Sequence, residues 1–245
     1  MTKAVVLIPA RYGSSRFLGK PLAMIAGKSM IQRVYMNCLE SGFECAVVTD
    51  HSEIEKHVKE FSGNVIRVDD DVPSGSERIA LAFQRFYEKS APELVINVQG
   101  DEPLLRGEIL KELANFHSKS SYDMTTLIRP RLSNEQDFKN PNVVKAVWSE
   151  VSGQCLYFSR QSVPYDRDGN KVFDWFQHIG VYSYRPQALL KFVKLSMSKL
   201  EHLEKLEQLR AMENGFSIGA IKTTQKLIGV DVPEDIKKVE GALGE

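Results

Sequence analysis

Three positively charged side chains, Arg11, Arg16 and Lys20, lie within ten residues of one another near the N-terminus. They follow the run Ala4–Ile8, which is typical of a buried strand in a parallel sheet. A loop of small residues at the carboxyl end of such a strand can point backbone N–H groups at a phosphate, and three cations supply charge for a triphosphate. The small residues of this loop are Gly13, Ser14, Ser15 and Gly19.

The same loop is also compatible with a solvated basic surface segment. It contains neither G-x-x-x-x-G-K-[ST] nor G-x-G-x-x-G, the two standard phosphate-binding patterns. A nucleotide bound here is therefore held by a different scheme. The missing glycine pattern also argues against a nicotinamide-dependent dehydrogenase.

Two carboxylates, Asp101 and Asp231, each follow an apolar run and precede a helix-like segment. Gly100, next to Asp101, lets a ligand approach the backbone closely. Mg²⁺ takes oxygen ligands and often bridges to substrate phosphates, so Asp101 is a candidate ligand that Asp231 could complement. Acidic residues are also favourable at the start of a helix, and this structural alternative stays open for both.

A small turn, Ser74-Gly75-Ser76-Glu77-Arg78, opens a helical pattern. Its hydroxyl and N–H groups could contact a base or ribose, and Arg78 could reach a base edge. The alternative is a helix N-cap at Ser74 with Glu77 in the first turn.

Polar and charged groups also occur on strand and helix patterns in the second half of the chain. From the residues alone, each is equally compatible with a structural role. These residues are Arg160, His178, Tyr182, Glu207 and Gln208.

Strand-like and helical runs alternate through the first half. Strands are expected over 4–8, 45–49, 65–68 and 94–98, and helices from about 29, over 52–61 and over 77–89. This alternation predicts an α/β fold with a mostly parallel sheet covered by helices on both faces. Such sheets bind ligands at the carboxyl ends of their strands, which places the 9–20 loop, Asp50 and Gln99-Gly100-Asp101 along one rim.

The second half has longer strand patterns over 124–128, 143–147, 154–159 and 179–184, which predict a smaller mixed-sheet insertion. One amphipathic helix is expected over 200–212, a strand that returns to the main sheet over 218–221, and a last helix started by Pro233. We therefore expect a single domain over 1–245. Its nucleotide-binding core covers about 1–120 and 215–245, and a smaller subdomain covers about 121–214.

The composition excludes several classes of protein. The formal net charge is zero, with 32 Lys and Arg against 32 Asp and Glu, so no overall field favours nucleic acid or an anionic membrane. The three cysteines form no C-x-x-C pair, which is typical of a reducing cytosol. No apolar run is long enough for a signal peptide or a membrane span. We expect a cytoplasmic protein without membrane insertion or nucleic-acid binding.

Eight blocks of the chain, in the same order, closely resemble the sugar-acid cytidylyltransferases, and among them the members that act on 3-deoxy-manno-octulosonate (Kdo). The first and third blocks read Ile-Pro-Ala-Arg-Tyr-Gly-Ser-Ser-Arg-Phe-Leu-Gly-Lys-Pro-Leu and Asn-Val-Gln-Gly-Asp-Glu-Pro. The blocks span 8–22, 74–78, 97–103, 140–145, 156–160, 178–182, 206–210 and 229–235.

The resemblance implies a Rossmann-like three-layer sandwich of the nucleotide-diphospho-sugar transferase type. It implies an enzyme that joins CTP and Kdo into CMP-Kdo and pyrophosphate for lipopolysaccharide biosynthesis, with Mg²⁺ as cofactor. It also implies a homodimer and a sugar-binding or dimerisation role for the 121–214 subdomain, whose apolar strands are a candidate interface. A related sugar acid, 8-amino-Kdo or a sialic acid, and a non-catalytic nucleotide-binding regulator are the alternatives.

Carried over by position, the resemblance implies four groups of site residues. The catalytic residues are Lys20, Arg11, Arg16 and Asp101. The nucleotide-binding residues are Pro9, Ala10, Arg11, Lys20, Ser74, Gly75, Arg78 and Gln99. The residues that face the sugar acid are Gln99, Arg160, His178, Tyr182, Glu207 and Gln208, with Arg160 as the partner of its carboxylate. The metal ligands are Asp101 and Asp231.

The chain departs from the family pattern at two places. Leu18 stands where the family usually has proline, which removes a restraint on φ from the first loop. Val72-Pro73 stands where the family usually has His-Gln before the Ser-Gly turn. Neither departure removes a charged group from the set above.

Overall fold

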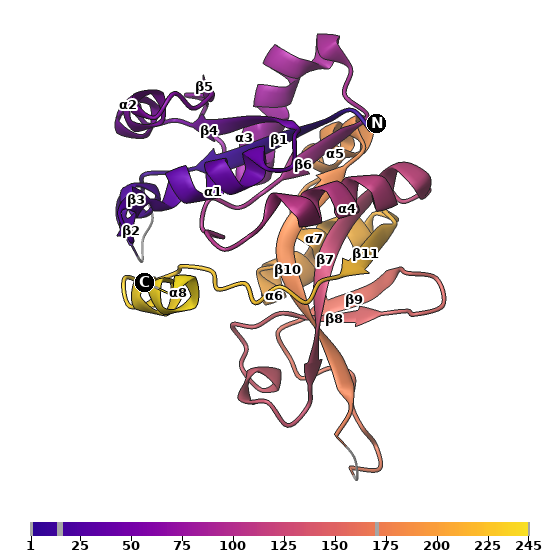
Figure 1. The fold of residues 1–245 in the computed structure, drawn as a ribbon. Helices are drawn as coiled ribbons and strands as arrows, with labels where there is room; N and C mark the ends of the chain where they lie inside the picture. Colours follow the sequence, from indigo (N-terminus) through magenta and orange to yellow (C-terminus); the bar gives the residue numbers. More distant parts are fainter. Residues whose placement is uncertain (1, 14–16, 170–171, 245) are drawn as a thin grey trace. The chain divides into compact units, whose positions relative to one another are not determined.

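The computed structural model describes residues 2–13, 17–169 and 172–244, which form two compact units. The first unit consists of Met1–Ala114 and Lys226–Glu245, and the second of Asn115–Gln225. Figure 1 shows the ribbon coloured along the chain. The predicted boundaries between core and subdomain lie at about 120/121 and 214/215 in the sequence. The boundaries between the two units lie at 114/115 and 225/226.

The sheet of the first unit consists of parallel strands in the order β6 (Leu94–Asn97), β1 (Ala4–Ala10), β4 (Glu44–Thr49) and β5 (Val65–Arg67). Every residue of β1 and β6 is buried. Because side chains point alternately to opposite faces of a strand, both faces of the sheet are covered. The α/β architecture expected from the alternating pattern is confirmed.

Helices α1 (Met30–Leu39), α2 (Ser52–Glu60) and α3 (Gly75–Ala82) pack against this sheet. The predicted helix over 77–89 is present as three successive helical segments. They are α3, a π-helical turn, η2 (Phe83–Tyr87), and a 3-10 turn, η3 (Glu88–Ser90).

The C-terminal helix, α8 (Asp235–Leu243), belongs to the first unit and lies beside a small hairpin of β2 (Met24–Ile25) and β3 (Lys28–Ser29) (Figure 1). The Glu240 carboxylate accepts a hydrogen bond from the Ala26 N–H at 3.1 Å. Apolar side chains of the hairpin, of the first residue of α1, of α8 and of the segment before α8 form one cluster, against which Phe17 packs. The buried members are Ile25, Met30, Val230 and Val239.

The second unit contains a mixed sheet, as predicted. Its strand β7 (Met124–Leu132) pairs parallel with β11 (Ile218–Lys222) and antiparallel with β10 (Asp174–Tyr184). Strand β8 (Lys145–Trp148) pairs antiparallel with β10 and with β9 (Cys155–Ser159). The helical segments are α4 (Gly107–Lys119), which carries the chain from the first unit into the second, η4 (Gln136–Phe138), α5 (Pro186–Phe192), α6 (Lys199–Glu204) and α7 (Glu207–Glu213).

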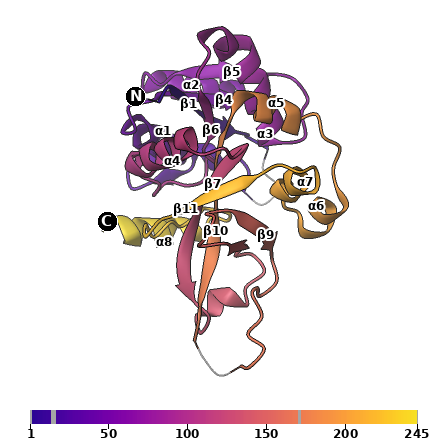
Figure 2. The ribbon, with the colours of Figure 1, turned by 90° about the vertical axis from the view of Figure 1, so that its right-hand side faces the viewer.

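The single amphipathic helix predicted over 200–212 is wrong. Figure 2 shows two separate helices, α6 and α7. Lys205 adopts a left-handed conformation, with φ of 52°, which an α-helix does not accommodate, so α6 ends there. The strand expected over 218–221 is present as β11, which pairs parallel with β7 in the same sheet as β1.

No helix in the described part of the chain has the length and apolar character needed to cross a membrane. All three cysteines, each of which is described, are buried and unpaired.

His117 of α4 is a fully buried histidine of the second unit. Its Nε2 lies 3.1 Å from the Tyr122 carbonyl, which can only accept, so Nε2 donates. Its Nδ1 is then free to accept from the Ser183 hydroxyl at 2.8 Å. Burial lowers the pKa of His117 to about 4.

This burial makes stability depend on pH. Between pH 6.5 and about 4 the unfolded chain protonates His117 and the folded chain does not, so the free energy of unfolding falls as the pH is lowered through this window. We expect His117 to account for about 3 kcal/mol of that fall, all of it regained above pH 6.5. Urea unfolding from pH 4 to 7 should give a shallower pH dependence for His117→Gln. The exposed His202→Gln is the control, and identical slopes for wild type and His117→Gln would contradict the prediction.

Candidate functional site

A cavity of about 330 Å³ opens at the carboxyl ends of β1 and β6 in the first unit. This is the rim at which parallel sheets bind ligands. Its lining residues are Pro9, Ala10, Arg11, Gly13, Lys20, Pro21, Gly75, Gln99, Gly100 and Asp101. Most of the predicted nucleotide-binding residues and the predicted metal ligand Asp101 therefore surround one cavity. Arg16, which we predicted to be catalytic, lies outside the described residues.

Two glycines bring other segments close to Pro9. A Cβ atom on Gly100 would lie 3.0 Å from the Pro9 carbonyl oxygen, and one on Gly75 would lie 3.2 Å from the Pro9 ring. The first distance is to a backbone atom that cannot move aside. The loop after β6 can therefore approach the end of β1 this closely because Gly100 has no side chain.

Lys20 joins three separate segments of the first unit. Its Nζ donates to Asp101 Oδ2 at 2.6 Å and to the Val230 carbonyl at 2.9 Å. The Val230 N–H in turn donates to the Asp101 carbonyl at 3.0 Å. Gly19, at φ of 69°, turns the chain into η1 (Lys20–Leu22) and donates its N–H to Tyr12 O at 2.9 Å. The bond between Gly19 and Tyr12 closes the loop that carries Lys20. The Lys20 ammonium thus lies beside Val230, the residue that precedes Asp231.

Glu102 is a buried carboxyl close to the negative charges of Asp101 and Asp231. Burial, and then the negative charges of Asp101 and Asp231, raise its pKa to about 8, against the opposing effect of Lys20. Its Oε2 is buried without a hydrogen-bond partner among the described residues. The carboxylates of Asp101 and Asp231 are therefore near enough to act on one buried carboxyl.

The described residues contain no group of three or more His, Cys, Asp or Glu side chains arranged to hold a metal ion. Mg²⁺ is commonly bound by one or two carboxylates together with substrate phosphates. Two hard oxygen donors in a region of excess negative charge therefore fit Mg²⁺ better than they fit a structural metal.

The other cations of the site differ in whether a carboxylate neutralises them. Arg11 donates to the carbonyls of Val72 and Pro73 at 3.1 and 3.0 Å and forms no ion pair with a described carboxylate, so its charge stays available to an anion. These contacts use backbone atoms, so the unusual side chains at 72–73 do not prevent them. Leu18, the other departure, is exposed.

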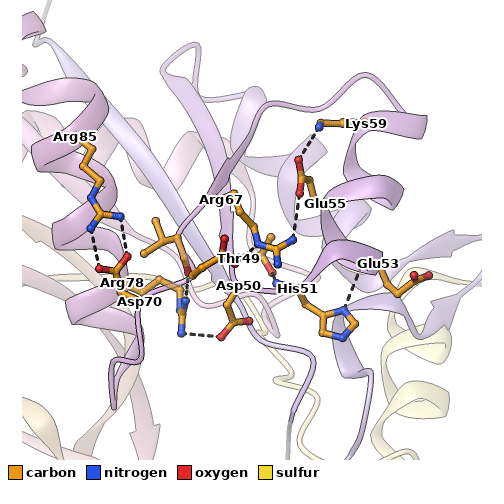
Figure 3. A network of polar contacts seen from close by, with 12 residues as sticks. Thr49, Asp50, His51, Glu53, Glu55, Lys59, Arg67, Asp70, Arg78 and Arg85 are labelled. Atoms are coloured by element: carbon orange, nitrogen blue, oxygen red, sulfur yellow. Dashed lines mark hydrogen bonds and ion pairs between the residues drawn. The ribbon is translucent and has the colours of Figure 1, made fainter.

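Arg78, in contrast, is buried and paired (Figure 3). Its guanidinium donates to the Val68 carbonyl and lies 2.7 Å from Asp50 Oδ2, and burial lowers its pKa. Ser74 and Glu77 form a capping box at the start of α3. Both predicted nucleotide-binding side chains, Ser74 and Arg78, are thus engaged within the protein, and neither lines the cavity.

Two of the predicted sugar-acid residues meet in the second unit. The register between β10 and β7 shifts between Ile179 and Tyr182. Four residues of a regular strand span about 13 Å, whereas the ring centroids of His178 and Tyr182 are 5.4 Å apart. The irregularity in β10 therefore brings these rings together.

The protonation of this pair is set by its surroundings. Burial lowers the pKa of His178 to about 3, so its ring is neutral at physiological pH. Burial, followed by the effects of Tyr184 and Glu207, raises the pKa of Tyr182. The pair can therefore exchange hydrogen bonds with a ligand but supplies no positive charge.

One cation of the second unit that was predicted to face the sugar acid is Arg160, which follows β9. Its guanidinium donates only to backbone carbonyls and forms no ion pair with any described carboxylate. Gln208 on α7 is buried, and its Nε2 has no partner within the described residues. An unneutralised cation and an unused donor are both suited to an anionic, polar ligand.

Residues 5–226 match the family model described as Cytidylyltransferase. The chain belongs to the cytidylyltransferase family. Proteins named 3-deoxy-manno-octulosonate cytidylyltransferase from Thermodesulfovibrio yellowstonii and Desulfatibacillum aliphaticivorans are 42% and 43% identical to it. The alignments cover 98% of this chain in both cases, and 97% and 98% of those relatives.

A solved structure of CMP:2-keto-3-deoxy-manno-octonic acid synthetase complexed with CTP matches this cytidylyltransferase with a TM-score of 0.90 at 35% identity. The match covers 99% of both chains. Another cytidylyltransferase, from Leptospira borgpetersenii, shares the fold with a TM-score of 0.65 at 14% identity. Family membership agrees with the resemblance found in the sequence.

Sequence reasoning left two residues of this cytidylyltransferase without a role. Asp50 was placed on the rim, but nothing local indicates that it pairs with Arg78, 28 positions later. Nothing local distinguishes Glu102, because the burial of its carboxyl depends on the distant C-terminal segment. Only the contact between segments identifies these two.

The pairing of Asp50 with Arg78 predicts a loss of stability when it is broken. Asp50→Ala leaves a buried guanidinium without its carboxylate, and we expect the free energy of unfolding to fall by about 2 kcal/mol. Asp70→Ala is the control, because Asp70 and Arg85 form an exposed pair at 2.7 Å and should contribute much less. Urea denaturation at pH 7 measures both, and equally small losses would contradict a structural role for Asp50.

Proposed function

We propose that this protein joins CTP and the sugar acid Kdo to give CMP-Kdo and pyrophosphate, a step in lipopolysaccharide biosynthesis. The observation that carries the proposal is the cavity lined by Arg11, Lys20 and Asp101, in a chain that matches a CTP-bound synthetase over nearly its whole length. The names of the curated relatives support Kdo as the sugar acid.

The reaction is an in-line displacement at the α-phosphorus of CTP. The anomeric oxygen of the sugar acid forms a bond to this phosphorus, the bond to the bridging oxygen breaks, pyrophosphate leaves, and the hydroxyl proton is released to solvent. Such a reaction asks for positioning and charge stabilisation more than for covalent chemistry. Arg11 and Lys20 supply positive charge to the triphosphate, and the Pro9–Ala10 backbone lies against the nucleotide.

Mg²⁺ is part of this proposal, with Asp101 and Asp231 as its ligands. When bound, the ion polarises the α-phosphate and favours ionisation of the attacking hydroxyl. Lys20 contributes by holding the Asp101 carboxylate in place through the 2.6 Å contact. The charge gathered around Glu102 supports a cation at this point.

We assign the carboxylate of the sugar acid to Arg160, because its positive charge is unneutralised and His178 is neutral. His178, Tyr182, Glu207 and Gln208 would form hydrogen bonds with its hydroxyl groups. Gln99 lines the first-unit cavity and would contact either substrate there.

We further propose a cytoplasmic homodimer. Unpaired cysteines are typical of reducing compartments. Exposed apolar side chains on or beside second-unit strands, Leu132, Leu156 and Val172, offer a surface for a second copy. Sedimentation equilibrium tests this, since a mass equal to the 27.7 kDa of one chain contradicts it.

A substrate panel tests the function directly. Pyrophosphate release from CTP is measured with Kdo, 8-amino-Kdo and a sialic acid under the same conditions. We expect Kdo to give the highest kcat/KM. Turnover of another sugar acid without turnover of Kdo would reassign the substrate, and CTP binding without release from any of them would indicate a regulator.

The charged groups of the cavity can be tested one by one. We expect Lys20→Ala and Asp101→Asn each to lower kcat/KM by about 10²-fold, the scale for losing one transition-state charge contact. Asp101→Asn should also raise the Mg²⁺ concentration needed for half-maximal rate. Lys59→Ala, which removes an exposed lysine paired with Glu55, is the control. Near-normal turnover and metal dependence of a folded Asp101→Asn enzyme would contradict the metal assignment.

A further inference from the structure

Glu204 holds Arg160 by both its backbone and its side chain. The Glu204 Oε2 accepts from the Arg160 backbone N–H at 2.9 Å, and its Oε1 accepts from the Ser159 hydroxyl at 2.7 Å. Its backbone carbonyl accepts from Arg160 Nε at 2.6 Å. Glu204, which is 44 positions after Arg160 in the sequence, therefore accepts three hydrogen bonds from the end of β9 and the residue that follows it.

The end of helix α6 explains why these acceptors are available. The last carbonyls of a helix have no partner within it, and they favour a nearby cation. Helix α6 ends at Glu204, and Lys205 leaves it in a left-handed conformation. The carbonyls of Glu204 and Lys205 both point to the Arg160 guanidinium, at 2.6 and 3.5 Å.

These contacts restrain Arg160 without cancelling its charge. Carbonyls carry no net charge, and the Glu204 carboxylate is used by a backbone N–H and a hydroxyl. A guanidinium has five N–H groups. Three contacts to carbonyls of Glu204, Lys205 and Pro141 leave two N–H groups without a partner among the described residues.

Lys145 restrains the backbone carbonyl of Arg160. It is fully buried, and its Nζ donates to the Arg160 carbonyl at 3.0 Å and to the Asn140 carbonyl at 2.7 Å. The N–H, the carbonyl and the guanidinium of Arg160 are thus each held by a separate interaction. Such restraint reduces the conformational entropy that binding would otherwise remove.

We propose that Glu204 is a positioning residue for sugar-acid recognition, which holds Arg160 so that its two remaining N–H groups meet the substrate carboxylate. The inference rests on the proposed function, in which Arg160 binds that carboxylate. Glu204 does not touch the substrate itself and acts through Arg160.

The test is a double-mutant cycle between the two residues. Glu204→Gln keeps the shape of the side chain but puts an amide NH₂ against one of its two donors. We expect it to raise the KM for Kdo about tenfold, with the KM for CTP unchanged. Arg160→Ala should raise the KM for Kdo further, and the double variant should match Arg160→Ala alone because Glu204 has nothing left to position.

Matched controls separate positioning from general destabilisation. Glu150→Gln removes an exposed carboxylate of the same unit, paired with Lys222 at 2.7 Å, and should leave both KM values unchanged. A purely structural role of Glu204 would instead give additive effects in the cycle or raise the KM for CTP as well. Either of these results, or an unchanged KM for Kdo in Glu204→Gln, overturns the inference.

The experiment also distinguishes a wrong assignment of Arg160 from a Glu204 variant that does not fold. If Arg160→Ala leaves the KM for Kdo unchanged, the carboxylate assignment fails and the inference fails with it, while the substrate panel still decides the reaction. If Glu204→Gln does not fold, Ser159→Ala removes one of the two bonds to the Glu204 carboxylate and should raise the KM for Kdo about threefold. An unchanged KM in that variant overturns the inference.

Discussion

The contact of the Lys20 ammonium with Asp101 and with the Val230 carbonyl is the interaction on which the first unit's site depends. It joins the loop after β1, the loop after β6 and the segment that leads into α8. These three segments are far apart in the sequence, so their loop entropy opposes the arrangement unless specific contacts offset it. The backbone bond from Val230 to Asp101 and the apolar cluster around Val230 provide such contacts.

A second theme is how the protein holds a cation that must remain charged. Arg11 and Arg160 are both restrained by backbone carbonyls, which satisfy N–H groups without bringing a negative charge. Arg78, which ties α3 to the end of β4, is paired with a carboxylate instead. Among these three arginines, the choice of acceptor thus separates Arg11 and Arg160, which are available to an anionic substrate, from Arg78, which stabilises the fold.

Much of the first unit could be predicted from local patterns. Apolar runs of four to seven residues separated by helical periods are the signal of a parallel sheet, and the rim rule then placed Lys20 and Asp101 near each other. The roles of single residues were less predictable. The capping box of Ser74 and Glu77 is local, and the sequence offered it as an alternative to nucleotide binding. The burial of Arg78, in contrast, depends on the packing of α3 against β1 and β4. The split of the expected helix at Lys205 was missed because amphipathic spacing continues across it.

The sequence by itself determined the family, the parallel sheet and the charged residue types available for chemistry, because these depend on composition and short-range order. Only the tertiary structure decided which charges are neutralised and which side chains meet. The 5.4 Å approach of His178 to Tyr182 depends on the register of β10 against β7. The hydrogen bonds from Arg160 to Glu204 depend on where α6 ends. Both are set by contacts between distant segments, whose partners no local pattern specifies.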